Sequence, residues 1–186
     1  MRIAVVGTGY VGMSIAVLLA QHSDVTVIAT ASRPETQAWV RDLGAHHVID
    51  HGKPLAEQIA ALGLGAPAFV FSTNATEQHL PGIAEMVAPQ GRVALIDDPK
   101  VLDIVPFKRK SVSVHWEFMF TRSLFQTADI QAQGDLLAEV ARLVDAGTLR
   151  STLAEHFGTI NAGNLKRAHA AIETGRTKGK IVLEGF

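Results

Sequence analysis

The sequence of 186 residues contains no cysteine, which excludes disulfide bonds, thiolate zinc sites and a cysteine nucleophile. It also lacks an excess of charge of either sign, since 17 Lys and Arg stand against 18 Asp and Glu. Such a chain has no positive field that would concentrate nucleic acid or an anionic membrane surface. No apolar run reaches the roughly 20 residues of a membrane-spanning helix, and glycines interrupt the apolar start too early for a signal peptide. We therefore expect a cytoplasmic protein that binds neither nucleic acid nor membranes.

Short apolar runs of strand length alternate with helical patterns along the chain. The runs show little polar alternation, which is typical of parallel strands buried on both faces. They cover residues 3–6, 25–30, 47–50, 68–72, 93–97 and 112–116. Amphipathic helices are expected at 11–19, 34–43, 55–62, 77–87, 136–144 and 165–174, and a last strand at 180–183. The pattern predicts an α/β fold: a doubly wound (Rossmann) parallel six-stranded sheet with helices on both faces.

The most specific local motif is a glycine-rich turn directly after the first predicted strand. Its G-x-G-x-x-G spacing allows a tight turn, close approach of the backbone to a pyrophosphate, and close packing of helix on strand. The following helix N-terminus offers unpaired N–H groups to the anion. We therefore interpret residues 1–186 as a single dinucleotide-binding domain. The residues of the expected cofactor-binding turn are Gly7, Thr8, Gly9, Tyr10, Val11 and Gly12.

The residues that follow the second predicted strand indicate which dinucleotide binds. An Asp or Glu about 20 residues after such a turn normally binds the ribose hydroxyls of NAD. Here that position is Ser32, between Thr30 and Arg33, and no carboxylate is present to repel a 2′-phosphate. Hydroxyls and a guanidinium can bind this phosphate, so NADP(H) is preferred over NAD(H). The alternative is that Ser32 caps a helix and Arg33 is merely solvated.

The larger part of the chain contains four informative stretches, which read VIATASR (27–33), LGAHHVIDH (43–51), GRVALID (91–97) and GKIVL (179–183). In this order and spacing, residues 25–186 resemble the cofactor-binding domain of the medium-chain dehydrogenases and reductases. The zinc-type alcohol dehydrogenase-like and quinone oxidoreductase-like members are the most similar. The resemblance implies an oxidoreductase whose parent chemistry is hydride transfer between NADPH and a carbonyl or quinone.

The same resemblance suggests further residues near the cofactor. Ser72, Thr73 and Asn74 would lie near the cofactor ribose, and Asp97 near the cleft. The segment 115–122, with the aromatic and Met cluster at 118–120, would approach the nicotinamide, although such clusters are more often core.

The family also carries a GroES-like catalytic domain, which the resemblance implies is absent from residues 1–186. We therefore expect this chain alone to bind the cofactor without efficient turnover, and to contain no catalytic residue and no zinc. The surface left by the absent domain is expected to favour a homo-oligomer or a partner chain.

The first 24 residues are similar to a different family. The turn that reads GTGYVG at 7–12 is typical of UDP-glucose dehydrogenases, whereas the medium-chain family usually has a small residue in place of Tyr10. The cysteine nucleophile of that other chemistry is missing. The chain is therefore interpreted as a hybrid joined near residue 25.

Two other functions stay open: a non-enzymatic module that senses NADPH or binds a partner, and a folded hybrid scaffold whose glycine turn serves packing alone. A metal site at His46, His47 and His51 beside Asp50 is not expected, because neighbouring strand residues point to opposite faces. The basic residues 108–110 are expected to form a solvated connection.

Overall fold

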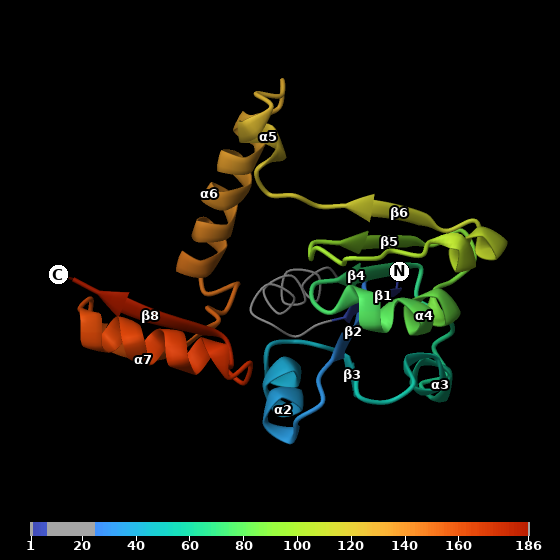
Figure 1. Cartoon of the computed structure of the whole chain (residues 1–186), viewed down its shortest axis with the longest axis horizontal. Helices are drawn as coiled ribbons and strands as arrows, with labels where there is room; N and C mark the ends of the chain where they lie inside the picture. Colours follow the sequence, from blue (N-terminus) through green and yellow to red (C-terminus); the bar gives the residue numbers. More distant parts are fainter. Residues whose placement is uncertain (1, 7–24, 186) are drawn as a thin grey trace.

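The parallel sheet has the strand order β3-β2-β1-β4-β5-β6 in the computed structural model, which describes residues 2–6 and 25–185 (Figure 1). The order runs outward from β1 in both directions, which is the doubly wound arrangement, so the predicted fold class is confirmed. Every neighbouring pair is parallel. The strands are β1 (Arg2–Val6), β2 (Thr26–Thr30), β3 (His47–Ile49), β4 (Phe69–Ser72), β5 (Arg92–Leu95) and β6 (Ser113–Trp116).

The helices begin and end close to the positions that the sequence predicts. Pro34 opens α2, where its missing N–H costs nothing, and Gly44 follows the helix end with a φ of 109°. Pro81 lies inside α4 without ending it. The described helices are α2 (Pro34–Asp42), α3 (Leu55–Ala61), α4 (Thr76–Met86), the 3₁₀ helix η1 (Val105–Lys110), α5 (Thr121–Leu124), α6 (Gln131–Asp145) and α7 (Ala162–Glu173).

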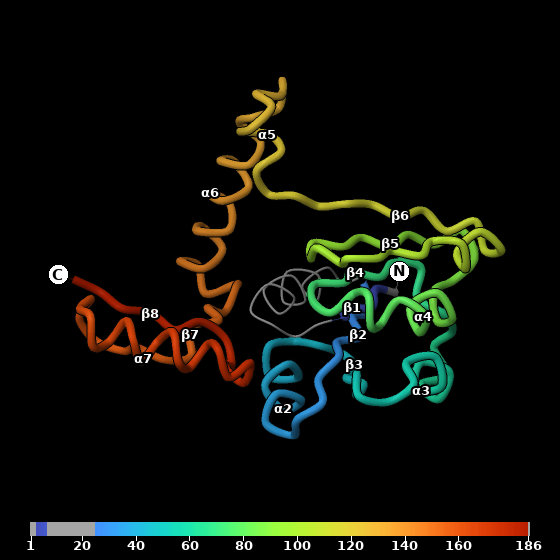
Figure 2. Tube along the Cα trace, in the orientation of Figure 1, coloured from blue at the N-terminus to red at the C-terminus, as the bar shows by residue number. Residues whose placement is uncertain are grey.

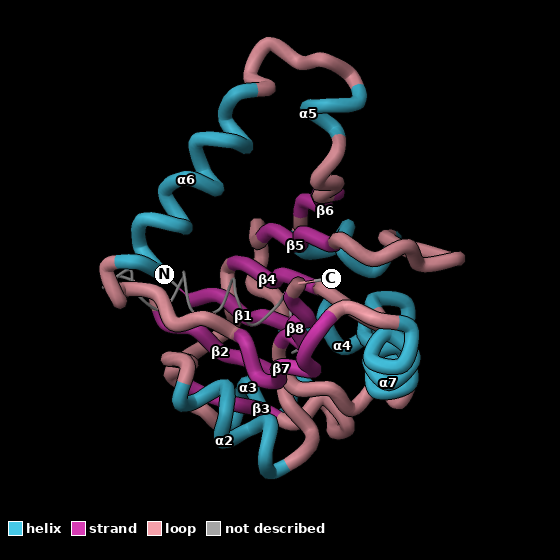
Figure 3. Tube along the Cα trace, turned by 90° about the vertical axis from the view of Figure 1, so that its left-hand side faces the viewer, coloured by secondary structure: helices cyan, strands magenta, loops and turns pink. Residues whose placement is uncertain are grey.

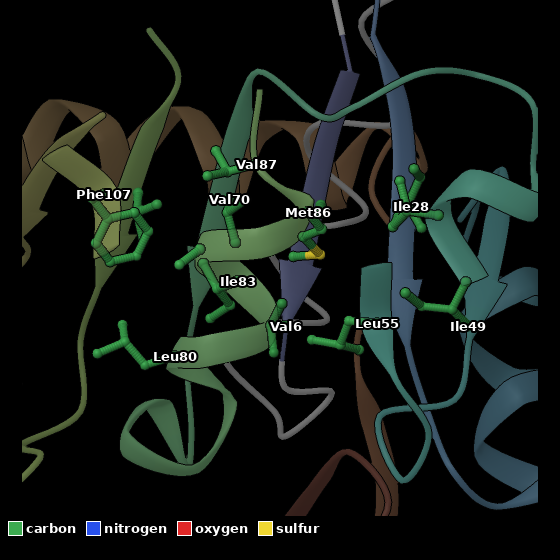
Figure 4. Packing of buried hydrophobic residues seen from close by; sticks show 14 residues of the cluster. Val6, Ile28, Ile49, Leu55, Val70, Leu80, Ile83, Met86, Val87 and Phe107 are labelled. Carbon is green, nitrogen blue, oxygen red and sulfur yellow. The ribbon is translucent and has the colours of Figure 1, made fainter. Parts of the chain in front are cut away.

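Alternate residues of the strands pack against helices on opposite faces of the sheet. On one face α3 and α4 cover a cluster that includes Ile28 of β2, and on the other Ala29 packs with residues of α2. The sheet is therefore covered on both faces. Figure 4 shows the larger cluster, with the labelled residues Val6, Ile28, Ile49, Leu55, Val70, Leu80, Ile83, Met86, Val87 and Phe107.

The basic residues after β5 do more than form the solvated connection expected of them. Phe107 of η1 is 2% exposed, and the Lys110 ammonium donates to the carbonyl oxygens of Ala84, Glu85 and Val87 at 3.0, 2.6 and 2.8 Å. The last carbonyls of a helix lack partners within it, and a lysine can supply them. The expectation is therefore wrong for Lys110, which closes the C-terminal end of α4.

The C-terminal part forms a unit of its own beside α2. The strands β7 (Leu153–Thr159) and β8 (Lys180–Glu184) pair in parallel as a separate two-stranded sheet, connected by α7. The sequence predicts β8 and α7 but not β7. Figure 2 shows the end of α7 close to α2, and hydrogen bonds between the two regions agree.

The segment between β6 and the C-terminal unit extends away from the sheet. Figure 3 shows α5 and α6 standing out from it, and Leu136 and Leu137 of α6 are 61% and 62% exposed. Among the helices of residues 2–6 and 25–185, none combines the length and apolar character needed to cross a membrane.

Candidate functional site

A cavity of about 430 Å³ lies beyond the ends of β2, β3 and β4, and β1 lies between β2 and β4 in the sheet. The loop after β2 contributes Ser32 and Arg33, the loop after β3 contributes His51, and the loop after β4 contributes Asn74. The carboxyl ends of parallel strands near the reversal of strand order are where doubly wound sheets bind ligands. Residues 175–178, from the C-terminal unit, complete the wall through Gly175, Thr177 and Lys178.

Arg33 is fixed at the start of α2 by contacts on two sides. Its Nη2 donates to the carbonyl oxygen of Arg176 at 3.0 Å, and its Nε lies 3.4 Å from a carboxylate oxygen of Glu35. Neither contact uses Nη1. Arg33 occupies the N-cap position of α2 without a capping side chain, so the alternative in which Ser32 caps this helix is wrong. Ser32 is exposed and lines the cavity.

The loop after β4 is held by a buried network of hydroxyl groups. The Ser72 and Thr76 hydroxyl oxygens lie 2.7 Å apart, and both residues are fully buried. The Thr76 hydroxyl donates to Asp97 Oδ1, and its backbone N–H donates to Asp97 Oδ2 at 2.8 Å. Asp97, just beyond the end of β5, therefore satisfies the N-terminus of α4.

Thr73 anchors the same loop to β1. Its N–H and hydroxyl both donate to the carbonyl oxygen of Val6, at 2.9 and 3.2 Å. Of the three residues expected near the ribose, only Asn74 lines the cavity, whereas Ser72 and Thr73 hold the loop that carries it. Thr30 is fully buried at the end of β2 and does not line the cavity. The predicted turn lies outside the described residues: Gly7, Thr8, Gly9, Tyr10, Val11 and Gly12.

The histidines that the sequence analysis considered for metal binding have separate positions. His46 Nδ1 accepts a hydrogen bond from the Val27 backbone N–H at 3.1 Å, which ties it to β2. His51 lies in the cavity wall against His79, with ring centroids 5.9 Å apart and an edge-on orientation. Burial, and then the charge of His51, lowers the pKa of His79. His51 Nδ1 is buried without a partner.

The sequence analysis missed most of the other lining residues, and three of these have aromatic or cationic side chains. His79 lies one helical turn into α4, and Trp39 lies within α2, where its hydrophobic periodicity predicted core packing only. Lys178 lies more than 140 positions from Arg33 in the sequence, and its Nζ is 5.5 Å from the centre of a Trp39 ring. No local motif marks a residue that only tertiary folding brings to the site.

The described lining of the cavity carries positive charge and no carboxylate. Arg33 and Lys178 are its cationic side chains, His51 and His79 are titratable, and none of the lining residues is Asp or Glu. Two acids adjoin the lining: Asp50 Oδ1 accepts the Gly52 backbone N–H at 2.8 Å, and a Glu35 carboxylate oxygen lies 3.4 Å from Arg33 Nε. Such a lining favours an anionic ligand.

The aromatic and Met cluster after β6 lies on the segment that leads to α5. Phe118, Met119 and Phe120 are 56%, 68% and 55% exposed, so the alternative that they form part of the core is wrong. None of them lines the cavity.

Comparison with known proteins now gives the family. Residues 43–183 match the family described as zinc-binding dehydrogenase. The chain belongs to this family. A zinc-type alcohol dehydrogenase-like protein of Staphylococcus aureus is 30% identical over 178 residues, which cover 95% of this chain and 53% of that protein. The chain thus spans about half the length of the curated relatives it matches.

Solved structures share the fold over the whole chain. A crystal structure from Rhizobium etli CFN 42, described as a zinc-dependent alcohol dehydrogenase protein, is 60% identical, with a TM-score of 0.95 over 100% of this chain and 54% of that one. A mycobacterial protein solved in complex with NADPH is 23% identical, with a TM-score of 0.80 over 99% of this chain and 56% of that one. This second likeness shows a common fold alone.

These comparisons confirm the main resemblance. The chain is a Rossmann cofactor-binding domain of the zinc-type alcohol dehydrogenase-like oxidoreductases. The similarity to UDP-glucose dehydrogenase and the hybrid origin gain no support, because the Rhizobium etli structure matches across the full chain.

The zinc of the family description finds no ligand set in the described part of the chain. Within residues 2–6 and 25–185, no three His, Asp or Glu side chains are grouped so that they could hold a metal ion, and the sequence has no cysteine. The residues described therefore do not fit a zinc site.

Proposed function

We propose that this chain binds NADP(H) in preference to NAD(H), as the cofactor-binding domain of an oxidoreductase that acts on a carbonyl or a quinone. The observation that carries the proposal is the convergence of Ser32, Arg33 and Asn74 on a cavity whose described lining lacks carboxylates. A carboxylate after β2 would accept hydrogen bonds from the ribose hydroxyls of NAD but would repel a 2′-phosphate. A hydroxyl and a guanidinium at this place fit the phosphate instead.

Each predicted residue has a separate part in this proposal. Arg33 binds the 2′-phosphate through its Nη1 donors, which the contacts with Arg176 and Glu35 do not use. The Ser32 hydroxyl donates a hydrogen bond to the same phosphate. Asn74 contacts the ribose from the loop that Ser72 and Thr73 hold. The turn at 7–12 binds the pyrophosphate. When bound, the nicotinamide supplies or accepts the hydride.

Residues 1–186 alone are proposed to bind the cofactor without efficient turnover. Hydride transfer needs a substrate held close to the nicotinamide and a surface that excludes water from it. Phe118, Met119 and Phe120 are exposed, so within the described residues they do not enclose a second binding site.

A parallel fluorescence titration with NADPH and NADH tests the cofactor preference. Charged hydrogen bonds to a phosphate predict NADPH binding roughly 10- to 100-fold tighter than NADH. Arg33→Ala should lose most of this margin, whereas Arg41→Ala, an exposed arginine in the last turn of α2 that does not line the cavity, should keep it. Equal affinities for the two nucleotides in the unaltered chain would refute the proposal.

The exposed apolar residues support a second part of the proposal, association with a second copy or a partner chain. Trp116, Leu124 and Phe125 are 58%, 65% and 71% exposed along the segment that extends from the sheet. Exposed apolar surface of this kind commonly marks an interaction site. A strictly monomeric chain by sedimentation that also binds no apolar dye would contradict it, and would remove support for a non-enzymatic interaction module.

A further inference from the structure

The cavity has a second cationic wall that comes from the C-terminal unit. Residues 175–178 return from α7 toward α2, and Gly175, Thr177 and Lys178 face the same space as Ser32 and Arg33. The Arg33 side chain reaches this segment directly, because its Nη2 donates to the Arg176 carbonyl oxygen at 3.0 Å. The loop after β2 and the return segment therefore line one subsite together.

The return segment is held in a defined conformation. Gly175 and Gly179 have φ values of +64° and +65°, which glycine adopts at little cost. A Cβ on Gly179 would collide with the Thr152 carbonyl oxygen and would meet Trp39 at 2.7 Å, so the backbone lies directly against α2. The Thr177 hydroxyl donates to the Ala171 carbonyl oxygen at 2.9 Å. Lys178 is thus attached to a fixed backbone between two anchors.

Lys178 itself is placed for a ligand rather than for a protein partner. Its ammonium lies 5.5 Å from the centre of a Trp39 ring, a contact that holds the charge beside the cavity. Among the described residues it forms no salt bridge, whereas Arg33 has Glu35 nearby. Its three donors and full charge are therefore available at a cavity wall without carboxylates.

We infer that Lys178 is a specificity-determining residue that contacts the 2′-phosphate of NADP(H) together with Arg33. The chemical group recognised is a phosphomonoester, whose three oxygens can accept donors from both walls at once. Trp39 positions the lysine ammonium, and Arg33 joins the two walls through the Arg176 carbonyl. This inference rests on the proposed NADP(H) function and adds a residue that the loop after β2 does not supply.

Nucleotide titrations of Lys178 variants test the inference. Lys178→Met removes the charge and keeps the length of the side chain, and should weaken NADPH about tenfold while leaving NADH unchanged. Lys178→Arg should keep most of the NADPH affinity. Lys166→Met, an exposed lysine on α7 that does not line the cavity, makes the same change of net charge and should leave both affinities unchanged.

The outcomes separate this inference from the proposed function. If the unaltered chain does not prefer NADPH, the proposed function fails before any variant is compared. If Arg33→Ala loses the preference but Lys178→Met keeps it, the inference is overturned and the function stands. Parallel loss of NADH affinity in Lys178→Met would indicate a general disturbance of the cavity and would also overturn the specific role. If Lys166→Met and Lys178→Met lowered the NADPH affinity equally, the effect of Lys178 would be one of net charge alone, and a direct contact with the phosphate would be refuted.

Discussion

Asp97 holds the start of α4, directly after the loop that carries Asn74, and Asp97→Ala tests this contribution. The carboxylate accepts hydrogen bonds from the Thr76 backbone N–H, at 2.8 Å, and from the Thr76 hydroxyl. The Ser72 hydroxyl oxygen lies 2.7 Å from the Thr76 hydroxyl oxygen. Loss of an N-terminal helix partner costs about 0.5–2 kcal/mol, and each buried polar group left unpaired about 1–3 kcal/mol. Because the hydroxyls of Ser72 and Thr76 can still pair with each other, we expect about 2–4 kcal/mol in total.

Equilibrium unfolding in urea, followed by tryptophan fluorescence, measures this loss. The midpoint should fall without a change in the m-value, and Tm should fall by roughly 5–10 °C for a chain of this size. Asp97→Asn should lose about half as much, since its amide can still pair with both Thr76 groups. Asp98→Ala is the matched control, because Asp98 is exposed next in the sequence and has no hydrogen bond to a described residue.

Two outcomes would refute this reasoning. A stability loss for Asp97→Ala no larger than that for Asp98→Ala would mean that the network contributes nothing to α4. A large loss with unchanged NADPH affinity would mean that the loop does not position Asn74. We expect the folded variant to bind both nucleotides more weakly. Asn74 and the strained Ala75, at φ +54°, directly precede Thr76, which Asp97 holds in place.

Three further predictions follow from single contacts. Lys110→Met should lower the free energy of unfolding in urea by about 1–2 kcal/mol, because the last carbonyls of α4 lose their donor, whereas Lys108→Met should change it little. Because the pKa of His79 is lowered in the folded chain, the unfolded chain binds more protons, and stability falls as the pH drops below 6.5. In His79→Gln the urea midpoint should therefore decrease less over the same acidic pH range. Gly179→Ala should shift the return segment away from Trp39, and near-ultraviolet circular dichroism should report the changed tryptophan environment.

The sheet could be predicted from sequence because its signal is local. The central strands are buried, so continuous Val, Ile and Ala mark them without reference to the rest of the chain, whereas β6 is mostly exposed at the edge of the sheet. β7 was missed for the opposite reason. Its sequence, LAEHFGT, is exposed over most of its length and pairs only with β8, so no alternation of buried and exposed residues marks it.

Only those site residues that directly follow a strand could be predicted from the sequence. Ser32 and Arg33 were found by counting from the glycine turn, and Asn74 by resemblance to the family. Ser72 and Thr73 were assigned to the ribose because loop sequences do not show which hydroxyls face inward, and here they face Thr76 and β1. Lys178 depends on how the C-terminal unit docks, which no spacing in the sequence encodes.

This docking couples phosphate recognition to the packing of the C-terminal unit on α2. Leu149 is buried with Val40 of α2 and with Leu43, which follows the helix, and the Arg150 guanidinium contacts Asp42 at 3.1 Å. The same unit also places Lys178 at the cavity, whereas Asn74 and Arg33 lie in the loops after β4 and β2. A change that loosens only this packing, such as removal of the Leu149 side chain, therefore acts unequally on the two nucleotides. The affinity for NADPH should fall because the segment that carries Lys178 moves away from the phosphate. The affinity for NADH should change little because its contacts lie in the loops that follow the strands of the sheet.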